Sequence, residues 1–193
     1  SSDYPFKNLC RLHQSQYRSD VLKVWFDEDI NVLNEEDGLK GLNFYDGFDI
    51  LKSVEERYGD RFKGGFRKPL YCNLLRSEHI PFNLFIPFKH DLDFGKKVFN
   101  EILGGVIDHI TEIEIEYPED TPTEYLKDRT SFDTYIEYQN IDGSLGIIGI
   151  EVKYTELSYK IGVKEKNEMD NPSSLYFQRS GESGVFLMGD FDT

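Results

Sequence analysis

Two strand-like segments joined by a tight turn place the strongest constraint on the fold of this chain. The segments are SFDTYIEYQN (131–140) and GSLGIIGIEVKYTE (143–156), and the turn between them is Asn140-Ile141-Asp142-Gly143. A turn with Asn and Gly between two β-rich segments predicts an antiparallel hairpin. Such a hairpin brings Asp133 beside Glu151 and Lys153 at one end of a sheet. That arrangement is typical of metal-dependent phosphodiester hydrolysis.

The alternation of side chains shows where these charges fall. In a strand, successive side chains point to opposite faces. Leu145 and Ile147 therefore share a face with Glu151 and Lys153, and this face becomes charged only at its end. We expect a strand buried on both faces along most of its length, where ionisable groups are costly unless they are paired or bound to a cation. The alternative is a solvated ion pair, because 30% of the residues are charged and Glu-x-Lys triplets arise by chance.

Length and composition predict one globular domain. We expect a single domain over 1–193, with an N-terminal helical extension at about 1–65. Aromatic residues make up 15% of the chain, which is ample for a packed core. The two cysteines, Cys10 and Cys72, form no disulfide framework and no metal spacing, so we expect free thiols in a reducing cytoplasm. The chain has no long apolar run and no signal-peptide pattern at its start, which predicts no membrane partner.

The charge of the chain argues against nucleic-acid binding, with one local exception. The formal net charge is −14, and an acidic surface repels phosphates. The segment 57–76 instead holds six cations against the single acid Asp60, with aromatic residues between them. Such a surface can follow a nucleic-acid backbone and stack bases. The alternative is a solvated loop around Gly64-Gly65. The candidate nucleic-acid-binding residues are Arg57, Arg61, Lys63, Arg67, Lys68 and Arg76.

Hydrophobic periodicity predicts the remaining elements. We expect helices over about 3–27, 48–58, 70–80 and 94–104. The first helix has an apolar stripe that is expected to face the core, and the last is expected to end at Gly104-Gly105. The run VIDHITEIEIEY (106–117) alternates as a half-exposed strand does, and 184–191 is compatible with a final strand. Pattern alone supports an α/β or α+β class.

Several motifs carry a resemblance to a known family. The run Asp128-Arg129-Thr130-Ser131-Phe132-Asp133, followed by GIIGIEVKYTE, resembles the PD-(D/E)XK nuclease superfamily, with the closest likeness to the bacterial PGN_0703-like restriction-endonuclease group. The stretch Leu75-Arg76-Ser77-Glu78-His79 and the strand ending Ile115-Glu116-Tyr117-Pro118 are similar to further motifs of that group. The likeness covers about 70–160. It implies an α/β fold with a restriction-endonuclease-like core, a mixed central β-sheet flanked by helices.

The resemblance also implies a site and an activity. Asp133, Glu151 and the carbonyl of Val152 are expected to bind Mg²⁺, for which Mn²⁺ can substitute. Lys153 is expected to orient or activate the attacking water and to stabilise negative charge. Such a metal should lower the pKa of Lys153. Glu78 is the candidate for a further catalytic carboxylate, with a hydrogen-bonding role as its alternative.

The expected partner is DNA, cut at its phosphodiester bonds in a role related to restriction or defence. A homodimer could pool the basic residues into one channel. Glu116 and Glu101 are weaker candidates for the further carboxylate, and His79, beside an apolar run, is expected to be structural. Glu156, five positions beyond Glu151, falls on the opposite face if the strand continues, so it is not a candidate. The rival interpretation is an acidic protein-binding module that keeps a nuclease-like fold without catalysis.

Overall fold

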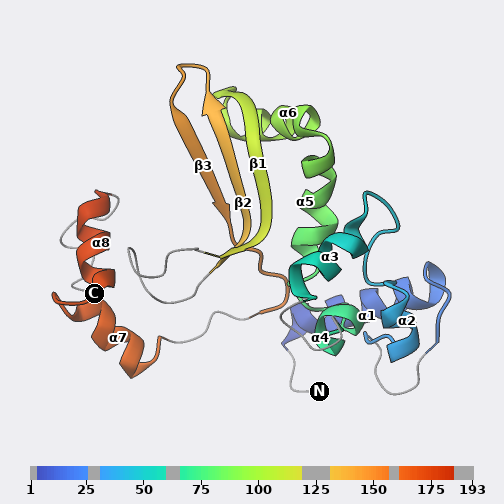
Figure 1. Ribbon diagram of the computed structural model, residues 1–193. Helices are drawn as coiled ribbons and strands as arrows, with labels where there is room; N and C mark the ends of the chain where they lie inside the picture. Colours follow the sequence, from blue (N-terminus) through green and yellow to red (C-terminus); the bar gives the residue numbers. More distant parts are fainter. Residues whose placement is uncertain (1–3, 26–30, 60–65, 119–130, 157–160, 185–193) are drawn as a thin grey trace. The chain divides into compact units, whose positions relative to one another are not determined.

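The computed structural model describes residues 4–25, 31–59, 66–118, 131–156 and 161–184. The chain divides into two compact units. The first consists of Ser1–Tyr117 with Phe132–Glu156, and the second of Pro118–Ser131 with Leu157–Thr193. Each unit is described by itself. Figure 1 labels their helices and strands.

The first unit combines helices with a three-stranded sheet. The sheet has the order β1-β2-β3, in which β2 and β3 pair antiparallel. This is the expected α/β class. The expected mixed sheet requires a parallel strand, and none is present among the described residues. Residues 185–191 of the expected final strand lie outside the described part of the chain. The helices are α1 (Pro5–Asp20), α2 (Glu35–Leu39), α3 (Ile50–Tyr58), α4 (Lys68–Cys72), α5 (Ile80–His90) and α6 (Leu92–Leu103), and the strands are β1 (Ile107–Pro118), β2 (Ser131–Asn140) and β3 (Leu145–Ile150).

The predicted hairpin is present, and its turn has the expected chemistry. The amide of Gly143 donates to the carbonyl of Asn140 at 2.9 Å, and the amide of Asn140 donates to the carbonyl of Ser144 at 2.8 Å. Gly143 has φ +84°, a left-handed conformation that glycine adopts without steric cost. The turn sets the register of β2 against β3.

That register corrects one expectation about β3. Ile148 of β3 pairs with Ile136 of β2, which is fully buried, and Ile148 packs against the core. On the opposite face Leu145 is 63% exposed and Ile147 is 55% exposed. The prediction of a strand buried on both faces was therefore wrong. The reason is that the core cluster lies against one face of β3, and the described residues of the first unit leave the opposite face exposed.

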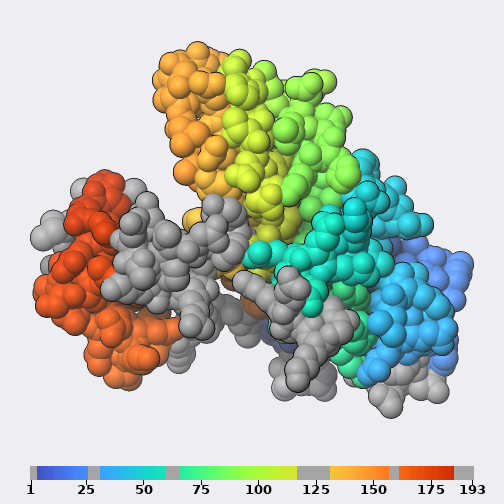
Figure 2. Space-filling model, in the orientation of Figure 1, coloured from blue at the N-terminus to red at the C-terminus, as the bar shows by residue number. Residues whose placement is uncertain are grey.

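The core lies between the sheet and the helices beside it. Figure 1 shows α5 running beside β1 and α6 crossing near the hairpin end of the strands, and in Figure 2 the green atoms of this part of the chain pack next to the strands. Isoleucines of β1 and aromatic residues of the helices form one buried cluster, and burial of each such side chain contributes about 1.5–3 kcal/mol. The main members of this cluster are Ile107, Ile110, Ile113 and Ile115 of β1, Phe82, Phe85 and Ile86 of α5, Phe99 of α6 and Ile136 of β2.

The first helix is present, but its apolar stripe does not face the core. Leu9 is 66% exposed and Leu12 is 54% exposed, and Trp25, beyond the helix end, is 74% exposed. The buried side chains of α1 are Cys10 and Arg18. The prediction of a core-facing stripe was wrong because α1 packs through polar contacts instead.

The helix expected over 70–80 is replaced by two helices. Helix α4 ends at Cys72 and α5 begins at Ile80. Pro69 and Pro81 lie in the first turns of α4 and α5, where a residue without an amide hydrogen costs nothing. The expected stop of α6 is confirmed, because Gly104 follows Leu103 with φ +76°.

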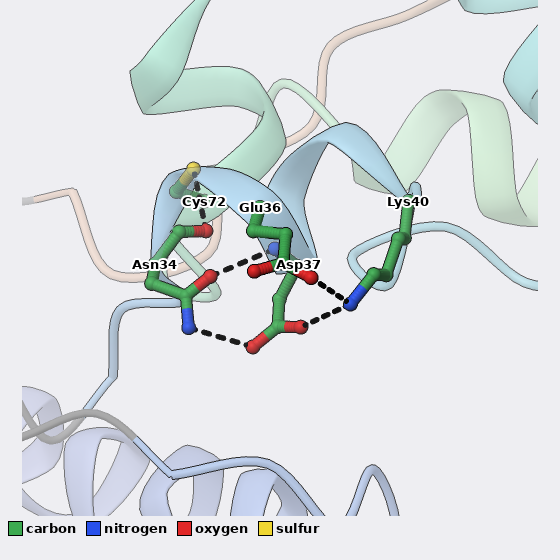
Figure 3. A network of polar contacts seen from close by, with 5 residues as sticks. All are labelled: Asn34, Glu36, Asp37, Lys40 and Cys72. Atoms are coloured by element: carbon green, nitrogen blue, oxygen red, sulfur yellow. Dashed lines mark hydrogen bonds and ion pairs between the residues drawn. The ribbon is translucent and has the colours of Figure 1, made fainter.

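A polar network holds the short helix α2 against α4 (Figure 3). The amide of Asp37 donates to Asn34 Oδ1 at 2.8 Å, and Asn34 Nδ2 donates back to the Asp37 carboxylate at 2.9 Å, which caps the helix start. The Cys72 thiol donates to the carbonyl of Asn34 at 3.6 Å. A Cβ on Gly38 would lie 2.4 Å from Cys72 Sγ, so the approach of α2 to α4 requires glycine at that position.

The second unit contains two described helices, α7 (Val163–Asp170) and α8 (Leu175–Ser183). Ser174 joins them, because its hydroxyl accepts from the amide of Phe177 at 3.1 Å and donates to the carbonyl of Glu168 at 2.5 Å. Among the described residues of the whole chain, the helices lack the length and apolar character needed to cross a membrane.

Candidate functional site

The hairpin brings Asp133, Glu151 and Lys153, three of the four predicted catalytic residues, to one end of the sheet. The pair Thr134–Ile150 ends the described ladder, and Asp133 and Glu151 are the residues next to this pair in the two segments. The amide of Val152 donates to Asp133 Oδ2 at 2.5 Å. The Lys153 ammonium donates to the Glu151 carboxylate. Residues 18 to 20 positions apart in sequence thus form one cluster.

The charges in this cluster act on one another. Burial raises the pKa of Asp133, and the negative charges of Glu151 and Glu156 act in the same direction. The hydrogen bond with Glu151 raises the pKa of Lys153, and the carboxylate of Asp133 adds to this effect. The carboxylates therefore hold the Lys153 ammonium in its charged form, whereas a bound cation would act in the opposite direction.

Glu116, at the end of β1, is a further acid of this region. Its φ is +54°, a left-handed conformation that is uncommon for a residue with a side chain. The Arg57 guanidinium donates to its carbonyl, and the Tyr58 hydroxyl donates to its carboxylate. Burial raises the pKa of Glu116, and so does the nearby negative charge of Asp133. The sequence offered Glu116 only as a weaker candidate, since a glutamate in an alternating strand is usually solvated.

Glu78 is held by two arginines. Arg76 Nη2 lies 2.8 Å from Glu78 Oε1, and Arg76 Nε donates to Oε2 at 3.2 Å. Arg67 Nη1 lies 3.0 Å from the same Oε1. Both carboxylate oxygens therefore have cationic partners, which agrees with the hydrogen-bonding alternative. The negative charge of Glu78 also contributes to the raised pKa of Glu116.

The other basic residues of 57–76 also have partners where they are described. Arg57 binds the carbonyl of Glu116, and Lys68 lies 3.0 Å from Glu35. Arg61 and Lys63 lie outside the described residues. Two of the aromatic residues between these cations, Tyr58 and Tyr71, are only 3% exposed. Those two rings belong to the core, so the prediction that they could stack on bases was wrong.

Sequence reasoning left out Glu156, which the structure places beside the cluster. The hydroxyl of Ser77 donates to its carboxylate at 2.7 Å, as does the amide of Tyr154. Burial acts to raise the pKa of Glu156, but these hydrogen bonds outweigh it and the pKa is lowered. Alternation had assigned Glu156 to the opposite face. That argument fails because β3 ends at Ile150 and strand geometry stops there.

His79 is buried, but its Nε2 has no hydrogen-bond partner among the described residues, so a structural role for it stays a prediction. The His79 ring is 9% exposed and precedes the first turn of α5. Burial lowers its pKa to about 4, so the ring is neutral at physiological pH. Glu101 is exposed near the end of α6.

A comparison with protein families supplies the deciding observation. A model described as the PD-(D/E)XK nuclease superfamily matches residues 1–192. The chain belongs to this superfamily. Its helices and antiparallel strands are consistent with the restriction-endonuclease-like fold, and membership supports a nuclease-type function. The comparisons with curated proteins and with solved structures gave no match.

The spacing in this chain contains the Asp and (Asp/Glu)-x-Lys pattern for which the superfamily is named. Along the chain Asp133 is followed by Glu151-Val152-Lys153, which reads as an acid, a spacer and a lysine. The hydrogen bond from Val152 to Asp133 joins the two halves of the pattern. The family match also extends beyond the likeness at 70–160 to both ends of the chain.

Proposed function

We propose that this protein is a metal-dependent nuclease that hydrolyses DNA phosphodiester bonds at Asp133, Glu151 and Lys153. The observation that carries the proposal is the hydrogen bond from the Val152 amide to Asp133, which joins the aspartate to the Glu-x-Lys step. The likeness to a restriction-endonuclease group adds a role in restriction or defence, in the cytoplasm, to the proposal.

The donor groups of the cluster suit Mg²⁺ or Mn²⁺. Asp133, Glu151 and the carbonyl of Val152 offer oxygen ligands, and Mg²⁺ is commonly bound by one or two carboxylates while it keeps several waters. Among the described residues no three His, Cys, Asp or Glu side chains are grouped to hold a metal ion. The Glu151 carboxylate is paired with the Lys153 ammonium, and its side chain is 56% exposed. Binding of a metal ion would therefore require Glu151 to release Lys153 and to contact the cation instead.

The cation and the residues around it would then have separate roles. A bound divalent cation would lower the pKa of a coordinated water and stabilise charge on the scissile phosphate. Lys153, released from Glu151, would orient the attacking water and stabilise the negative charge that develops. We further propose that Glu78 is a positioning residue. Its carboxylate contacts the guanidinium groups of Arg67 and Arg76 and would hold both in place for substrate binding.

The experiment that tests the function is DNA cleavage by the purified protein with Mg²⁺, Mn²⁺ or EDTA. Supercoiled plasmid and end-labelled linear DNA are incubated with the wild type. We expect nicked or shortened products in either metal and none in EDTA. An unchanged substrate in both metals, from protein with a cooperative melting transition, contradicts the proposal.

The second candidate is an acidic binding module without catalysis. The net charge of −14 favours it, because long-range repulsion opposes approach of DNA. The set of Asp133, Glu151 and Lys153 opposes it, since a binding module has no need of that combination. The same cleavage experiment separates the two, and a folded protein that neither cuts nor binds DNA supports the module.

A further inference from the structure

A small pocket lies between α1 and the segment that follows β3. Its volume is about 290 Å³. Three cationic side chains contribute to its lining, Lys7, Arg11 and Arg76, against the single carboxylate of Glu156. Pockets that enclose whole drug-sized molecules span roughly 300–1,000 Å³, so this one suits a small anionic group.

Polar contacts hold α1 at the edge of this pocket. The hydroxyl of Tyr4 donates to the carbonyl of Thr155 at 2.7 Å, which ties the start of the helix to the segment after β3. The Arg11 guanidinium donates to Asn31 Oδ1, and Asn31 is only 2% exposed. The inward polar face of α1, which the apolar stripe did not predict, thus carries Arg11 in a fixed position, and Lys7 of the same helix also lines the pocket. Preorganised groups of this kind lose less entropy when a ligand binds.

The pocket shares two of its lining residues with the surroundings of the candidate catalytic cluster. Arg76 lies 2.8 Å from Glu78, and Glu156 interacts electrostatically with Asp133 and Lys153. The chain as a whole carries a net charge of −14, yet in this lining cations outnumber acids. Glu156 is therefore common to the pocket lining and to the charges that act on the cluster.

We propose that this pocket binds a backbone phosphate of the DNA strand beside the phosphate that is cut, through Lys7, Arg11 and Arg76. The inference rests on the proposed nuclease function. It gives α1 a role in substrate binding, and it explains how an acidic protein can hold a polyanion next to its carboxylates. Charge neutralisation at backbone phosphates releases counterions and is therefore independent of DNA sequence.

The test is DNA binding by the full chain, measured without cleavage. Fluorescence anisotropy with labelled oligonucleotides in Ca²⁺ gives Kd at several salt concentrations for the wild type and Lys7→Gln. We expect Kd to rise about 5- to 10-fold and the slope of log Kd against log salt to fall by about 1. Lys97→Gln, which makes the same charge change on exposed α6, is the matched control and should leave Kd within about 2-fold.

Arg11→Gln provides a second variant, with its melting temperature measured because Arg11 also binds Asn31. If either folded variant keeps wild-type Kd and salt slope while the wild type cuts DNA, the phosphate pocket is refuted and the nuclease proposal stands. If the wild type neither binds nor cuts DNA, both proposals fail. Weakened binding with unchanged cleavage rate at saturating DNA supports the pocket.

Discussion

Replacing Lys153 by methionine is expected to lower the rate of metal-dependent DNA cleavage by about two to four orders of magnitude. Removal of a positioned acid–base group or of a charge that stabilises the transition state has effects of this size. Methionine keeps much of the aliphatic length and removes the ammonium. The Lys153 side chain is 63% exposed, so the melting temperature should stay close to that of the wild type. Single-turnover cleavage at saturating DNA measures the effect.

The matched control is Lys52→Met. Lys52 is similarly exposed at 68%, and its ammonium lies 3.6 Å from Glu56 on α3. Both variants lose one positive charge and one exposed ion pair, so a general effect of charge on DNA approach would appear in both. A Lys153 variant that cuts as fast as the Lys52 variant would show that the lysine of the Glu-x-Lys step takes no part in the chemistry.

Replacing Phe82 by alanine is expected to lower the free energy of unfolding by about 3–5 kcal/mol, the usual range for a buried phenylalanine. Phe82 is 1% exposed on α5, and its ring centroid lies 5.8 Å from that of Tyr58. Tyr58 in turn donates to the carboxylate of Glu116. The cavity would therefore weaken both the core and the support of this acid. Urea denaturation followed by circular dichroism gives the change in free energy.

Leu84→Ala on the same helix is the control for Phe82. Leu84 is 52% exposed, so its truncation should cost less than about 1 kcal/mol. Comparison of the two separates loss of core packing from any change in helix propensity of α5. Equal destabilisation by the two substitutions would mean that α5 does not pack as described.

The sequence predicted the hairpin well because the relevant signals are local. Strand alternation and the glycine of the turn act within a few residues, and together they set which residues face Asp133. The register then follows, and its last pair, Thr134–Ile150, lies next to Asp133 and Glu151. The stop signal of α6 was equally local, because Gly104 adopts the left-handed conformation at its end.

The errors arose where tertiary contacts override a local pattern. The apolar stripe of α1 predicted a core-facing surface, but Arg18 and the other inward polar groups contact the carbonyls and amides of distant segments. Burial of β3 on both faces was predicted from its apolar composition, which does not reveal that the core covers only one face of this strand. Glu156 was assigned by alternation beyond Ile150, where the strand has already ended.

The acids around the cluster could not be ranked from sequence. Glu78 and Glu116 both lie in motif-like stretches, and only the contacts distinguish them. Glu78 accepts from Arg76 and contacts Arg67, whereas Glu116 accepts from Tyr58 and interacts with the charge of Asp133. The contacts of Glu116 join segments far apart in the chain, and single-sequence patterns carry no signal for such distances.

The central claim is that Asp133 and Glu151 form one divalent metal site next to Lys153. The most direct measurement is anomalous X-ray scattering from a crystal of the full chain soaked in Mn²⁺. The account predicts one strong peak within about 2–2.5 Å of both carboxylates and of the Val152 carbonyl, with Lys153 turned away from Glu151. A peak elsewhere, with Glu151 still bound to Lys153 and Asp133 uncoordinated, would contradict it.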